Sequence, residues 1–130
     1  MEKQGHVSLW IGEIQTEEEL TDYVELVYTE EGEFLPSPFL SDFDIDIDDF
    51  DEDFLEKVLH ENRVENLTDL IQSCSYDHAV ILRFKSTMET TLPKNINAAI
   101  LLYNIQYDGR KDEIINNGYT FKFVGSVPYI

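Results

Sequence analysis

The sequence predicts an α+β domain of two layers, in which helices pack on one face of a mostly antiparallel, four-stranded sheet. Two observations support this fold class. Apolar and polar residues alternate near both ends of the chain, as is typical of strands, and apolar residues at helical spacing lie between these segments. The chain has 130 residues, so we expect one domain that spans residues 1–130.

The first predicted strand covers residues 6–12 and ends at Gly12. One face of this strand carries Val7, Leu9 and Ile11. A helix is expected next, because Thr16 and Glu19 form a capping box, a common start of helices. The apolar stripe of this helix comprises Leu20, Tyr23, Val24, Val27 and Tyr28.

The middle of the chain is expected to hold two further helices. Glu31-Gly32 marks a turn, and two prolines forbid a regular helix across residues 36–38. A second helix is predicted by the spacing of Phe54, Leu55, Val58 and Leu59. A third, short helix is predicted from Asn66, and its buried face comprises Leu67, Leu70, Ile71 and Cys74.

The second half of the chain is predicted to supply the other three strands. Residues 79–84 form a short apolar run, and residues 98–107 alternate between apolar and polar. One face of the latter strand is expected to carry Leu101, Tyr103, Ile105 and Tyr107. Asp108-Gly109 is typical of a turn, and residues 119–123 alternate again as a last strand.

The charge of the chain is its most informative property. Nine basic and 27 acidic residues give a net charge of −18. Residues 1–65 carry all of this net charge, with 21 acids and three bases, whereas residues 66–130 hold six of each. Such a chain is repelled by nucleic acid and by anionic membranes and is attracted to basic surfaces. We therefore expect a protein partner with a basic surface, and neither nucleic acid nor a membrane as a partner.

Cysteine usage and the N-terminus predict the compartment. Cys74 is the only cysteine, so no disulfide can form within the chain. Residues 1–10 show no apolar stretch or cleavage site of a signal peptide, and no apolar run approaches the ~20 residues of a membrane helix. The expected location is the cytoplasm. Because Cys74 lies on an apolar helical stripe, we expect it to fill the core.

The candidate binding residues lie in an acidic segment, defined here as residues 42–53. It contains no base and eight acids: Asp42, Asp44, Asp46, Asp48, Asp49, Asp51, Glu52 and Asp53. One interpretation is a calcium-binding loop, since the first three of these acids match the opening of an EF-hand. Against it, Ile47 stands where the sharp turn requires Gly, and Asp53 stands where Glu is usual.

The other two interpretations are a solvated acidic face and a docking surface for a basic partner. Eight like charges repel one another, so a cluster of this kind costs stability. Apolar residues interleave the acids and are expected to anchor the segment to the core: Phe43, Ile45, Ile47, Phe50 and Phe54. Charge alone does not choose between these two interpretations.

No arrangement of residues in the sequence predicts catalysis. The three histidines are scattered, no HExxH motif or glycine-rich phosphate loop is present, and acids are so abundant that pairs arise by chance. We therefore expect a protein that is not an enzyme and that uses no metal or other cofactor.

Three motifs occur in order within residues 5–60. They are W-x-G at residues 10–12, G-x-F-x-P-S-x-F at residues 32–39 and D-x-D-F at residues 51–54. In this series the chain resembles the bacterial immunity protein 22 family. The resemblance implies a protein that binds a cognate toxin domain of a polymorphic toxin system, often a nuclease, and so protects the producing cell. The basic substrate groove of such a toxin would suit the acidic segment.

Overall fold

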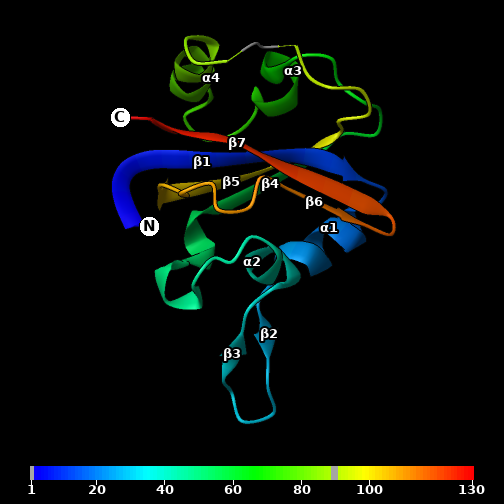
Figure 1. Cartoon of the computed structure of the whole chain (residues 1–130), viewed down its shortest axis with the longest axis vertical. Helices are drawn as coiled ribbons and strands as arrows, with labels where there is room; N and C mark the ends of the chain where they lie inside the picture. Colours follow the sequence, from blue (N-terminus) through cyan, green and yellow to red (C-terminus); the bar gives the residue numbers. More distant parts are fainter. Residues whose placement is uncertain (1, 89–90) are drawn as a thin grey trace.

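The structure is a computed structural model that describes residues 2–88 and 91–130. Its centre is a five-stranded antiparallel sheet in the order β4-β5-β1-β7-β6, and β2 and β3 form a separate hairpin (Figure 1). The strands are β1 (Glu2–Ile14), β2 (Val27–Tyr28), β3 (Phe34–Leu35), β4 (Leu55–Leu59), β5 (Ala98–Ile105), β6 (Glu113–Asn116) and β7 (Tyr119–Pro128). The α+β class with a mostly antiparallel sheet is confirmed, but the sheet has five strands rather than the predicted four.

Helices cover both faces of the sheet (Figure 1). The helical elements are α1 (Glu17–Val24), α2 (Pro38–Asp42), the 3-10 turns η1 (Ile47–Asp49) and η2 (Glu52–Phe54), α3 (Leu67–Ile71) and α4 (Asp77–Lys85). Helices α1 and α2 pack on one face, and α3 and α4 pack on the other. The prediction of two layers with helices on one face was therefore wrong.

Strand β1 explains this arrangement, because it is apolar on both faces. Val7, Leu9 and Ile11 pack with α3 and α4, as the alternation in the sequence suggested for one face. Trp10 and Ile14 point the other way and pack with α1 and α2, and both are fully buried. A strand with two apolar faces needs a cover on each side.

Asn104 reverses the alternation of β5 between the two cores. Its φ of 64° lies in the left-handed region, which interrupts the regular alternation of the strand. Residues before it, Leu101 and Tyr103, join the core under α3 and α4, whereas Ile105 and Tyr107 join the core under α1 and α2. The prediction that all four share one face was therefore wrong.

Three short segments account for the wrong strand count. Residues 55–59 form β4 instead of a helix, and they pair along β5. Residues 79–84 lie within α4 instead of forming a strand, and β6 was not predicted. Segments of this length fit both the helical and the strand period, so pairing and packing decide between them.

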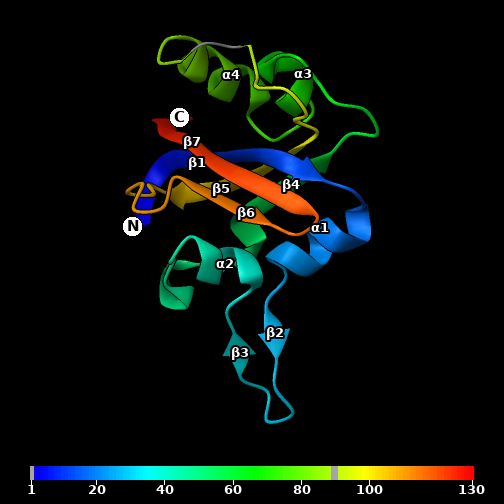
Figure 2. The ribbon, with the colours of Figure 1, turned by 45° about the vertical axis from the view of Figure 1, so that its right-hand side comes forward.

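The helix starts predicted at Thr16 and at Asn66 were confirmed. Thr16 Oγ1 accepts a hydrogen bond from the backbone N–H of Glu19 at 3.1 Å where α1 begins. At the start of α3, Asn66 Oδ1 accepts from the N–H of Asp69 at 2.8 Å. Helix α1 ends at Val24, earlier than expected, because the next residues turn away from the sheet and form the hairpin (Figure 2).

Gly12 is a point of close approach between β1 and β7, where a Cβ atom would overlap the carbonyl oxygen of Thr120. We predict that Gly12→Ala lowers the free energy of unfolding by about 1–3 kcal/mol, because the backbone of β7 must move. The matched control is Gly125→Ala on β7, whose Cβ would make an ordinary 3.6 Å contact with Phe84. Urea denaturation of both variants is the measurement, and equal losses would contradict the close approach.

Candidate functional site

The acidic segment leaves α2 and is anchored to the core at its start. Phe43 is fully buried, and its ring lies 5.8 Å from that of Trp10, centroid to centroid. The hydroxyl of Tyr107 donates a hydrogen bond to the backbone carbonyl of Phe43. Ile45 is also buried. The expected apolar anchoring therefore holds at the beginning of the segment.

The anchoring weakens toward the end of the segment. Ile47 and Phe50 are half-buried and pack at the edge of the core, but Phe54 is 44% exposed. The expectation that Phe54 anchors the segment was wrong. The second half of the acidic segment thus lies on the surface and is held by local turns rather than by burial.

Four of the eight acids have structural roles, and we call them the inner acids: Asp42, Asp44, Asp46 and Asp51. Asp42 Oδ2 accepts a hydrogen bond from the hydroxyl of Tyr23 at 3.0 Å. Asp44, with a φ of 56°, forms an ion pair with Arg110 at 3.2 Å. Asp46 caps η1 and Asp51 caps η2, since each carboxylate accepts from the backbone N–H two residues later at 2.9 and 3.0 Å.

The other four, Asp48, Asp49, Glu52 and Asp53, we call the outer acids. Within residues 2–88 and 91–130, their carboxylates make no hydrogen bond or ion pair. Asp49 is half-buried and the other three are exposed. Each 3-10 turn holds one pair of them: Asp48 and Asp49 lie in η1, and Glu52 and Asp53 lie in η2. A capping Asp precedes each pair. The sequence identified all eight acids but could not separate these two groups.

A cleft runs between the outer acids and β3. Its volume is about 700 Å³. The apolar side chains in its lining are Leu26, Phe34, Ile47 and Phe50. Six acids complete the lining: Glu2, Glu33, Asp48, Asp49, Asp51 and Glu52. None of the described residues that line the cleft is a Lys or Arg, so the lining itself carries no positive charge.

The β2–β3 hairpin contributes Phe34 to the lining of this cleft. It projects from the body of the protein (Figures 1 and 2). This hairpin was not predicted from the sequence; instead, Val27 and Tyr28 were assigned to the helical stripe. A signal was present, since Glu31-Gly32 is a turn flanked by a Val-Tyr pair before it and a Phe-Leu pair after it. The turn itself was confirmed, with Gly32 at a φ of 83°.

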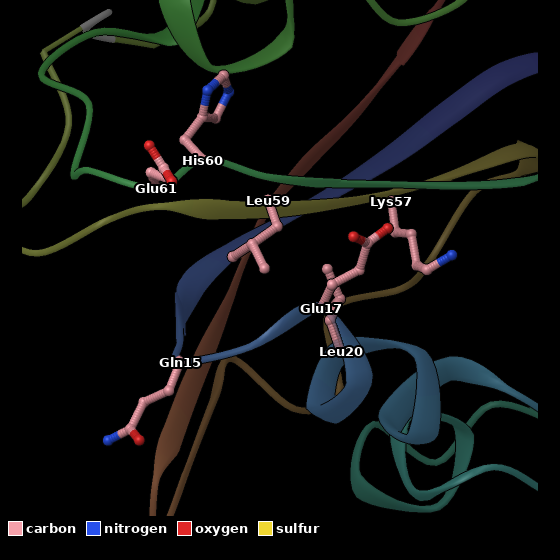
Figure 3. Close-up of a pocket in the computed structure, with 7 residues that line it drawn as sticks. All are labelled: Gln15, Glu17, Leu20, Lys57, Leu59, His60 and Glu61. Atoms are coloured by element: carbon pink, nitrogen blue, oxygen red, sulfur yellow. The ribbon is translucent and has the colours of Figure 1, made fainter.

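A second, smaller hollow of about 340 Å³ lies where α1 meets the end of β4. In Figure 3, Leu59 separates Glu17 and Lys57 on one side from His60 and Glu61 on the other, so the two carboxylates do not converge. The Nε2 atom of His60 forms a hydrogen bond with the backbone carbonyl of Leu70 at 3.0 Å, which directs the ring toward α3. These residues do not form a nucleophile–base pair.

Metal and thiol chemistry find little support in the described part of the chain. No group of three or more His, Cys, Asp or Glu side chains is placed there to hold a metal ion. The three acids at the opening of the suggested calcium loop instead contact Tyr23, Arg110 and the backbone of η1.

Burial, with smaller contributions from Glu56 and Asp77, raises the pKa of Cys74 to about 12, so this thiol stays protonated at neutral pH. It lies in the core, as expected.

Comparison with known proteins gives one match. The sequence profile of the family described as Immunity protein 22 matches residues 7–129, which extends well beyond the motifs in the first half of the chain. No curated protein and no solved structure matches the chain. Within the described residues, the helices are too short and too polar to cross a membrane.

The division into inner and outer acids predicts different effects on stability. We predict that Asp46→Ala combined with Asp51→Ala lowers the free energy of unfolding by about 0.5–2 kcal/mol per cap, because each 3-10 turn loses its capping hydrogen bond. Asp48→Ala combined with Asp53→Ala removes the same charge and should leave stability unchanged or slightly higher, since repulsion between like charges falls. Urea denaturation at low ionic strength compares the two. If both double variants change the free energy of unfolding equally, the division into inner and outer acids has no structural meaning.

Proposed function

Because this chain belongs to the immunity protein 22 family, whose name indicates a toxin-neutralising role, we propose that it binds a cognate toxin of a bacterial polymorphic toxin system through the outer acids. The toxin has a basic surface, and a nuclease fits best. The protein acts in the cytoplasm of the producing cell, where it meets the toxin.

One observation carries the proposal: the outer acids are ordered, yet they have no partner in the described residues. A carboxylate with a structural role would contact a donor or a cation, as each inner acid does. The outer acids instead repel one another at a cost in stability. A basic partner would relieve this repulsion, so the arrangement is expected of a surface selected for binding.

The chemistry of nuclease toxins suits such a surface. A nuclease binds the phosphates of its substrate with Lys and Arg side chains, which create a positive potential over its groove. Carboxylates held at fixed positions can occupy this potential in place of phosphates. Neutralisation then requires tight binding but no reaction, so the proposal requires no catalytic group in this chain.

Electrostatic steering would make association fast. We predict that Asp48→Lys combined with Asp49→Lys slows association with the toxin domain encoded by the adjacent gene by about 10- to 100-fold at low ionic strength. The wild-type rate should itself fall as salt rises, because the Debye length shrinks from ~30 Å at 0.01 M to ~10 Å at 0.1 M. Stopped-flow measurement over a salt series gives both quantities.

The matched control is Asp112→Lys combined with Glu113→Lys, which changes the net charge equally at an exposed site at the start of β6. Its association should slow much less, since only the overall charge changes. If the Asp48 and Asp49 variant associates as fast as wild type, the outer acids are a solvated face. If the wild-type protein neither binds the toxin nor protects cells from it, the proposed function is wrong.

A further inference from the structure

The β2–β3 hairpin exposes apolar side chains on both of its faces. Val27 pairs with Leu35 and Tyr28 pairs with Phe34 across the two strands. Cross-strand partners share a face and successive residues alternate, so one face is aliphatic and the other aromatic. These four side chains are 45–59% exposed. Single exposed apolar residues are ordinary, but four on one short ribbon indicate a binding surface.

The hairpin is ordered without support from the core. The backbone N–H of Thr29 donates to the carbonyl of Glu33 at 2.9 Å, and the N–H of Gly32 donates to the carbonyl of Thr29 at 3.0 Å. The N–H of Glu33 also donates to Thr29 Oγ1 at 3.1 Å. The rings of Tyr28 and Phe34 lie 4.4 Å apart. A ribbon ordered in this way loses less conformational entropy when it binds.

The tip of the hairpin is acidic. It carries Glu30, Glu31 and Glu33, all exposed, and none of them forms an ion pair within residues 2–88 and 91–130. The hairpin therefore combines apolar sides with a negatively charged end. A flat partner could cover one face only, whereas a recess can contact both faces and the tip together. A second copy of this chain is a poor occupant, because two acidic tips repel each other.

We propose that the hairpin is a finger that anchors the complex by entering a recess of the toxin whose walls are apolar and whose floor is basic. This proposal rests on the proposed function and specifies its second contact. Three of the outer acids, Asp48, Asp49 and Glu52, line the cleft beside the finger, together with Phe34 and Glu33. They attract the toxin, and the finger then holds it.

Different rate constants distinguish the finger from the outer acids. For Tyr28→Ala combined with Phe34→Ala, we expect the Kd for the adjacent-gene toxin domain to rise about 100-fold through faster dissociation, because buried aromatic anchors dominate binding energy. The association rate should stay within about threefold of wild type, since no charge changes. The matched control is Leu82→Ala on α4, which removes a 68% exposed side chain from the opposite side of the sheet. Its Kd should not change.

Thermal unfolding shows whether each variant keeps its fold, and we expect no change for exposed positions. If the aromatic variant unfolds, Val27→Thr combined with Leu35→Thr tests the other face of the same ribbon with residues that favour strands. If the wild-type protein binds the toxin but a folded hairpin variant dissociates at the wild-type rate, the finger proposal is wrong and the proposed function is unaffected. If the wild-type protein does not bind the toxin, the proposed function fails, and the finger fails with it.

Discussion

Strand β1 is buried on both faces at the centre of the sheet, and this single constraint organises the rest of the structure. Its alternate side chains require two separate cores, so helices must cover both sides. Strands β5 and β7 flank β1: β7 packs closely against it at Gly12, and β5 reverses its alternation at Asn104. Strand β1 therefore positions α2 and, through the contact between Trp10 and Phe43, the start of the acidic segment.

The acids are tolerated because they lie outside the two hydrophobic cores. The net charge of −18 belongs to residues 1–65, which contribute β1, both helical elements of one face and the hairpin. Three of the eight acids in the segment stabilise turns or pair with Arg110, and Asp42 accepts a hydrogen bond from Tyr23, which offsets part of the repulsion. Three of the outer acids, Asp48, Asp49 and Glu52, lie on one side of a cleft, and the hairpin lies on its other side. In the proposed complex, this juxtaposition would separate long-range attraction from short-range anchoring within one surface.

Much of the fold could be predicted where the signal is local. The helix starts at Thr16 and Asn66 are held by hydrogen bonds between residues three apart, so the signal for each start is local. The strands at residues 6–12 and 98–107 were also predicted, although β5 changes its alternation at Asn104. Residues 55–59 were predicted as helix and form a strand, whereas residues 79–84 were predicted as a strand and lie in a helix. Five or six apolar-rich residues fit either period, so their neighbours in space decide which structure they adopt.

The sequence by itself determined the fold class, the family, the concentration of charge in the first half and the eight acids of the segment. Only the tertiary structure decided which acids are free, because the partners of Asp42 and Asp44 are Tyr23 and Arg110, and Arg110 lies 66 positions further along the chain than Asp44. It also decided that the hairpin leaves its apolar residues in solvent. A sequence pattern records that a side chain is apolar, but burial depends on whether another element covers it.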